Sequence, residues 1–386
     1  MVSKSKTAPV RPVNAAVPDE RLAGRDRGDG PDVDGLGEPQ ELGMSGYPLD
    51  SMLIRSETRT VYDVFRRIGQ DNYVMNPDFQ RDFIWPLEKQ SRLVESLLMR
   101  IPLPVFYLAE RHDGKVVVID GLQRLTTITR YMRNEFSLPQ QDKDKGNKLF
   151  RGKTFNDLPP KLQNRIEDTP LILYILDEKV PELARLDIFE RVNSGEPLSR
   201  QQMRNCMHMG QATRLLADLA REDDFLTATD RSLNRRTMRD REMINRFMAF
   251  SLLGVKNYKG DMDQFLADAL TRMNELPENE LTSLKQSFLL SMRNNYHIWE
   301  MHAFRKHTPQ QEERKVINAA MFDVLSFLFS KVSEDKAREV AAKSREILFS
   351  LQEDDSFVSA ISQSTNNLRQ VETRFTLAEE RFKEVF

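Results

Sequence analysis

A short apolar run that leads through a polar turn into a helical pattern restricts the fold of this chain more than any other feature. The run covers residues 115–119 and is rich in valine, the turn covers 120–124, and apolar residues at helical spacing follow over 125–132. An unbroken run of β-branched residues is typical of a buried strand. The pattern therefore predicts a strand, a turn and the start of a helix.

The turn combines residues that suit an anion. The first turn of a helix leaves backbone N–H groups without partners and carries partial positive charge, so phosphate binds well there. Gly121 allows a ligand to approach the backbone closely, and Gln123 and Arg124 add side-chain donors. An alternative is that Asp120 only caps the helix and that Arg124 only pairs with a surface carboxylate.

Two other polar segments carry the same combination of arginine with glutamine or asparagine. Gln80 and Arg81 lie upstream of the turn, and Arg191 and Asn193 lie downstream of it. Such side chains are rich in donors and poor in nucleophiles, which suits holding a polyphosphate while water attacks it. A structural alternative stays open, in which Gln80 and Arg81 bridge to the next helix and Asn193 ends another.

The two halves of the chain differ in periodicity. Short extended runs alternate with helical patterns up to about residue 198, and helical periodicity prevails from about residue 199 onward. We expect an α+β domain over 51–198 and a mainly helical domain over 199–386. Residues 1–50 are rich in Gly, Pro, Asp and Arg and poor in large apolar side chains, so we predict a disordered tail there.

Local signals place several elements more closely. Residues 170–176 read as a strand, and Ser199 with Gln202 three residues later offers a capping box for a new helix. In the helix expected over 87–101, apolar residues fall on one stripe that would pack under the sheet. The Met- and Phe-rich stripe of the helix expected over 316–332 is typical of a core.

Composition excludes several classes of protein. The only cysteine, Cys206, rules out an internal disulfide, and the five histidines have no zinc-ligand spacing. No apolar stretch approaches the roughly 20 residues that a membrane span needs, so we expect no membrane contact and a cytoplasmic location. The formal net charge is −2, and bulk charge therefore does not indicate a nucleic-acid-binding protein.

Charge is nevertheless uneven along the chain. Arg235, Arg236 and Arg239 belong to an arginine-rich stretch that could form a basic strip for DNA phosphates. The alternative is a solvated helix face on which these arginines form ion pairs with Asp240 and Glu242.

The three polar segments resemble those of the GmrS-type family, the N-terminal domain of GmrSD type IV restriction enzymes. Its members carry a Pro-x-x-Gln-Arg-x-x-x-Trp segment, an Asp-Gly-Gln-Gln-Arg turn, and a Phe-x-Arg-x-Asn segment followed by Leu-Ser and an Arg. Residues 77–85, 120–124 and 189–204 are similar to these, and the resemblance covers the chain from about Met52 to the C-terminus. One departure is Leu122, which stands where the family usually has its first Gln.

The resemblance implies a ParB/sulfiredoxin-like fold for the N-terminal domain and a nucleoside triphosphate as ligand. It implies a component of an anti-phage restriction system that hydrolyses this nucleotide with Mg²⁺, which Asp120 could hold together with Asp78. No Gly-rich run ends in Lys-Ser or Lys-Thr, so a P-loop enzyme is excluded. On this reading the catalytic residues are Asp120, Gln123 and Arg124, and the nucleotide contacts are Gln80, Arg81, Gly121, Arg191 and Asn193.

The cutting half of such a system is an HNH-type nuclease, built from closely spaced His and Asn around a metal. This sequence lacks that pattern, so we expect a separate nuclease subunit as partner, with duplex DNA and a homo-oligomer as further possibilities. The alternative hypothesis is a ParB-like DNA-binding adaptor or DNA-nicking nuclease without nucleotide turnover.

Overall fold

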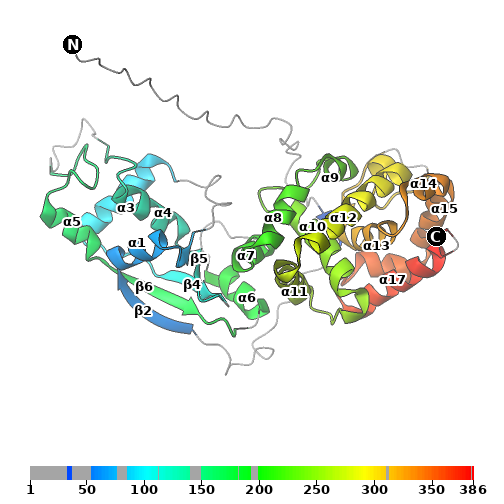
Figure 1. The fold of residues 1–386 in the computed structure, drawn as a ribbon, viewed down its shortest axis with the longest axis horizontal. Coiled ribbons are helices and arrows are strands. Elements are labelled where there is room, and N and C mark those ends of the chain that lie inside the picture. The colour runs from blue at the N-terminus through cyan, green and yellow to red at the C-terminus, as the bar shows by residue number, and fades with distance from the viewer. Residues whose placement is uncertain are drawn as a thin grey trace, which may run out of the picture.

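The computed structural model of the chain consists of a half that contains a β-sheet and a half built from helices (Figure 1). It describes residues 33–36, 54–75, 85–111, 113–139, 149–180, 182–192, 199–309, 313–383 and 385–386. The small sheet and the many helices agree with the predicted α+β class. Within these residues, no helix has the length and apolar character needed to cross a membrane.

The sheet has five strands in the order β2-β6-β4-β5-β3. The strands are β2 (Ile54–Thr60), β3 (Tyr73–Val74), β4 (Phe106–Glu110), β5 (Val116–Asp120) and β6 (Pro170–Leu176). β5 runs antiparallel to β4 and parallel to β3, and its residues Val116–Ile119 are buried. Burial on both faces explains why the valine run is unbroken.

One face of the sheet is covered by helices from the N-terminal half, as Figure 1 shows. They are α1 (Val61–Gly69), α3 (Leu87–Leu98), α4 (Leu122–Met132) and α5 (Pro160–Glu167). Val94 and Leu97 of α3 pack with Leu125 and Ile128 of α4 in the core on this face, which confirms the predicted stripe of α3. The helix ends before Ile101, which is exposed.

The opposite face is covered by α6 (Glu182–Val192) and α7 (Arg200–Met207). Met203 and Cys206 of α7 pack with Val117 and Ile119 of β5, and Ser199 starts α7 with the predicted capping box. We expected the helical domain to begin at 199, but the apolar side chains of α7 belong to the core of the sheet. The separate core of the helical half begins after it.

The helical half is built around α13 (Ala319–Phe329), whose buried side chains are mostly apolar. Its helices are α8 (Gln211–Leu219), α9 (Asp223–Ala228), α10 (Arg239–Leu253), α11 (Met262–Glu275), α12 (Glu278–Trp299), α13 (Ala319–Phe329), α14 (Glu334–Glu339), α15 (Ala341–Glu353), α16 (Asp355–Ser362) and α17 (Leu368–Phe382). Met321, Leu325 and Phe329 are buried, which confirms the predicted core stripe. Asp323, also buried, receives hydrogen bonds from the buried guanidinium groups of Arg246 and Arg374.

The N-terminal region contributes a short strand, so the prediction of a wholly disordered tail over 1–50 is wrong for residues 33–36. β1 (Val33–Asp34) pairs in parallel with β7 (Ile317–Asn318). Val33 is only 5% exposed, and the carboxylate of Asp34 lies 2.7 Å from the Lys306 ammonium. One buried valine and the backbone pairing hold this segment against the helical half; the rest of 1–50 lies outside the described residues.

Candidate functional site

The turn between β5 and α4 requires glycine. Gly121 adopts a φ of 94°, in the left-handed region that other residues rarely occupy. A Cβ atom at this position would lie 2.2 Å from Cδ1 of Phe106, which is a severe clash with the ring. Gly121 therefore lets the start of α4 approach the first residue of β4.

The N-terminus of α4 is open to an acceptor. Gly121 is the N-cap and brings no side chain, and the first backbone bond of the helix runs from the N–H of Leu125 to the carbonyl of Gly121. Among the described residues, no side chain accepts from the N–H groups of Leu122, Gln123 or Arg124. These three donors and the helix dipole therefore favour an anion.

Arg124 is held by its own protein. Its guanidinium lies 2.7 Å from the Asp120 carboxylate, donates to the carbonyls of Pro104 (2.5 Å) and Val105 (3.1 Å), and stacks 4.3 Å from the centre of the Phe106 ring. Burial lowers the pKa of Arg124, whose side chain is 12% exposed, and the charge of Asp120 opposes this shift. The structural alternative from the sequence is therefore met only in part: Arg124 pairs with a carboxylate, that of Asp120, but Asp120 does not cap the helix, because Gly121 is the N-cap and no side chain caps it. The Nε of Arg124 has no acceptor in the described part of the chain.

Gln123 connects the turn to the first polar segment. Its Oε1 accepts from the backbone N–H of Trp85 at 3.2 Å, and the Trp85 carbonyl accepts from Nε2 of Gln90. Trp85 itself packs against the core, as an anchor rather than a stacking platform. The end of the 77–85 segment and the 120–124 turn are thus adjacent, and the Gln123 amide nitrogen has no acceptor among the residues described.

Leu122, which departs from the family pattern, packs against the cores on both faces of the sheet. Its side chain therefore serves packing, while its backbone N–H belongs to the open start of α4. A leucine is compatible with this fold at the position where the family has glutamine.

The remaining predicted ligand contacts are only partly placed. Arg191 is exposed in the last turn of α6, a helix that contacts β5. Gln80, Arg81 and Asn193 lie outside the described residues, as does Asp78.

Asp120 alone does not build a metal site. The described residues contain no group of three or more His, Cys, Asp or Glu side chains that could hold a metal ion. One carboxylate oxygen of Asp120 is engaged by Arg124. A Mg²⁺ ion beside Asp120 would therefore take most of its ligands from nucleotide phosphates and water, as Mg²⁺ commonly does.

The predicted DNA-binding arginines differ from one another in their surroundings. Arg239 donates to the Glu242 carboxylate at 2.5 Å, the Nε of Arg235 lies 3.9 Å from a carboxylate oxygen of Asp240, and Arg236 is exposed. Burial raises the pKa of Asp240 to about 6. The structure thus places carboxylates beside two of the three arginines.

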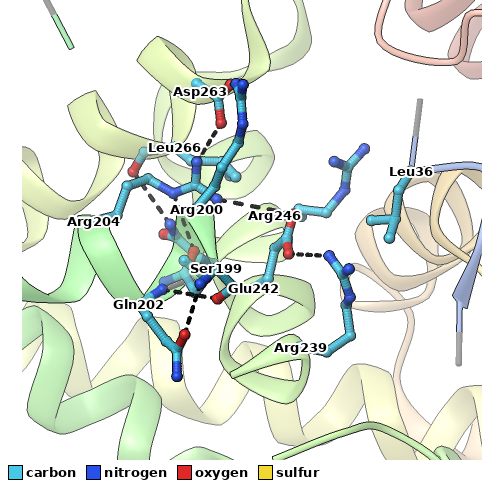
Figure 2. Close-up of polar contacts among 12 residues, drawn as sticks. Leu36, Ser199, Arg200, Gln202, Arg204, Arg239, Glu242, Arg246, Asp263 and Leu266 are labelled. Atoms are coloured by element: carbon cyan, nitrogen blue, oxygen red, sulfur yellow. Dashed lines mark hydrogen bonds and ion pairs between the residues drawn. The ribbon is translucent and has the colours of Figure 1, made fainter. Parts of the chain in front are cut away.

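A larger arginine–carboxylate cluster, which sequence reasoning missed, lies beside Arg239 (Figure 2). Arg200 and Arg204 of α7 both donate to the Asp263 carboxylate of α11, and Arg204 also lies 3.8 Å from Glu242 of α10. Arg204 is 1% exposed. The cluster fastens α7, which packs on the sheet, to the helical half, and no local sequence signal pairs residues so far apart.

One comparison with known proteins gives a match, and the matched range includes the turn. A family model described as "GmrSD restriction endonuclease, N-terminal domain" matches residues 61–209. This match spans four strands of the sheet, the helices that cover it and the Asp120–Arg124 turn. Comparison with curated proteins gives no match. Residues 61–209 therefore form a domain of the GmrSD N-terminal family.

Proposed function

We propose that the chain is the nucleotide-binding and hydrolysing component of a restriction-type anti-phage system that works with a separate nuclease. One observation carries the nucleotide assignment: the start of α4 is left without a cap, at a left-handed glycine beside Asp120 and Arg124. The match to the GmrSD N-terminal family supports the link to restriction. A ParB/sulfiredoxin-like origin of the sheet domain belongs to the same proposal.

Each residue of the turn has a distinct task in this proposal. The N–H groups of Leu122, Gln123 and Arg124 bind phosphate oxygens, because they have no acceptors of their own among the described residues. The Gln123 amide nitrogen adds a donor at the same helix end. Mg²⁺, when bound, neutralises phosphate charge beside Asp120. Arg124 positions the turn through its contacts with Asp120 and with the Pro104 and Val105 carbonyls.

The DNA-binding or DNA-nicking alternative relies on Arg235, Arg236 and Arg239. The ion pair of Arg239 with Glu242 weighs against it, since that guanidinium is already matched by a carboxylate. We therefore favour nucleotide binding. Duplex DNA is included as one variable in the hydrolysis assay.

Phosphate release from ATP, GTP, CTP and UTP with Mg²⁺, with and without duplex DNA, tests the proposal. The informative variants are Asp120→Asn and Gln123→Leu, which keep the size of the side chains and remove the carboxylate charge or the amide. Arg92→Ala is the matched control, because Arg92 lies exposed on α3 and, among the described residues, forms an ion pair with Glu88 alone.

Turnover of at least one nucleotide by the wild type and the Arg92 variant, with about a hundredfold loss in the Asp120 variant, is the expected result. Equal turnover in the wild type and both turn variants would contradict the assignment of the turn. Binding of a nucleotide without turnover would retain the site and remove the enzymatic part of the proposal.

A further inference from the structure

A cavity lies at the opposite end of β5 from the Asp120 turn. It has a volume of about 580 Å³, within the range of roughly 300–1,000 Å³ usual for small-molecule sites. Lys115 before β5, Thr129 of α4, Arg133 directly after α4, and Tyr73 of β3 line it. Lys115 and Asp120 are five residues apart in an extended chain, or about 16 Å.

The charges around this cavity favour an anion. Arg111, Lys115, Arg130 and Arg133 line it, against two acids, Asp71 and Glu135. Glu135 is already paired with Arg130 at 3.0 Å. Lys115 and Arg133 are exposed, and neither side chain has an ion pair with any residue that the structure describes. Two uncompensated cations at one cavity match a dianion better than a single carboxylate.

The cavity also lies where the two halves of the molecule meet. Met209, between α7 and α8, forms part of its wall, and Arg111 donates to the Met209 carbonyl at 3.2 Å. A ligand here would contact the sheet domain and the start of the helical half together.

We propose that this cavity is a second binding site, separate from the Asp120 turn, for a small ligand that carries a phosphate group. Lys115 and Arg133 bind the phosphate oxygens and neutralise their charge. The inference goes beyond the proposed nucleotide hydrolysis and does not depend on it.

Methionine methyl signals provide a probe of this site, because Met75 and Met209 both line the cavity. The full chain is labelled with ¹³C at the methionine methyl groups, and Met75→Leu and Met209→Leu assign the two signals. Inorganic phosphate, inorganic triphosphate and ATP are titrated separately, with sodium chloride at matched ionic strength as the blank. Saturable shifts of both signals with at least one phosphate compound are expected.

A double variant and a matched control separate a ligand site from a merely polar cavity. Lys115→Ala combined with Arg133→Ala should weaken binding about tenfold or more, whereas Arg92→Ala with Lys343→Ala, an exposed pair of equal charge, should not.

Absence of saturable shifts with all three phosphate compounds would overturn the proposal, as would equal weakening by the Lys115/Arg133 pair and the control pair. Loss of the Met75 and Met209 shifts in Asp120→Asn would show that the cavity is not a separate site. Affinity for ATP far above that for inorganic phosphate would identify a nucleotide, and equal affinities would identify phosphate itself. A protein that does not hydrolyse nucleotide would give the same outcomes in this titration, so the two proposals can fail separately.

Discussion

Arginine occurs in two contrasting settings in this protein. At the start of α4, Arg124 lies beside backbone N–H groups that have no acceptor among the described residues, and Asp120 is its sole carboxylate there. In the cluster of α7, α10 and α11, Arg200 and Arg204 share Asp263, and Glu242 is close by (Figure 2). The comparison teaches that the donors left over after internal pairing, rather than arginine itself, distinguish a binding site from a structural joint.

The largest effect on stability is expected in the cluster of α7, α10 and α11, where arginines and carboxylates are most completely paired. Asp263→Asn removes the charge that two arginines share. It leaves the buried guanidinium of Arg204 with the Gln201 amide and, as a carboxylate among the described residues, the more distant Glu242. Breaking a buried ion pair costs about 3 kcal/mol or more, so the free energy of unfolding should fall by about that amount in urea denaturation. Nucleotide binding by the folded fraction should be unchanged. A loss of stability below about 1 kcal/mol would show that the cluster is not a structural joint.

The turn is expected to depend on its glycine. Gly121→Ala places a Cβ against Phe106 at a positive φ, so we expect a loss of about 2 kcal/mol of stability and a loss of nucleotide binding. Gly69→Ala is the control, because a Cβ there meets no atom within 4 Å and φ is not positive. Thermal unfolding compares the two variants, and equal melting temperatures would refute the strain argument.

Asp240 lies in the arginine-rich region, but burial affects its pKa more than the neighbouring arginines do. Burial raises its pKa from the ordinary value of 3.8 to about 6, against the lowering influence of Arg241 and Arg235. Because folding raises this pKa, the folded state favours the protonated carboxyl, and stability falls as pH rises from about 4 through 6.

Asp240→Asn removes this penalty. The variant should be more stable than the wild type at pH 7 by on the order of 2 kcal/mol, and the difference should vanish below about pH 4. Urea denaturation at several pH values measures it. A variant less stable than the wild type at pH 7 would mean that the Asp240 charge is well paired after all.

The smallest effect concerns Leu122. Leu122→Gln restores the family residue and adds donors at the open helix start, so we expect nucleotide to bind several-fold more tightly. Loss of apolar packing should lower stability by about 1 kcal/mol. Calorimetric titration with nucleotide checks the affinity, and weaker binding by the variant would place the ligand away from this residue.

Local sequence signals predicted the local parts of the fold. The strand over 170–176 and the Ser199–Gln202 capping box occur in the structure as expected, because alternation, burial and capping act over a few residues. The valine run predicted β5 for a similar reason, because a strand that is buried on both faces of the sheet carries apolar residues at consecutive positions.

Long-range pairing was not predictable from these signals. Nothing near Val33 indicates that it pairs with Ile317, and nothing near Arg204 indicates Asp263. At the candidate site, Gln123, Gly121 and Asp120 were singled out by the turn pattern, but the carbonyls of Pro104 and Val105 that hold Arg124 come from the segment just before β4. Backbone acceptors carry no side-chain signature, so the structural role of Arg124 became visible only in three dimensions.

The most direct test of the central claim observes the backbone donors of α4 themselves. The ¹⁵N amide signals of Leu122, Gln123 and Arg124 are followed in the full chain while a nucleoside triphosphate and Mg²⁺ are added. The account predicts saturable downfield shifts of these amide protons, with an affinity that Asp120→Asn and Gln123→Leu change. Nucleotide binding that leaves these three amides unmoved would contradict it.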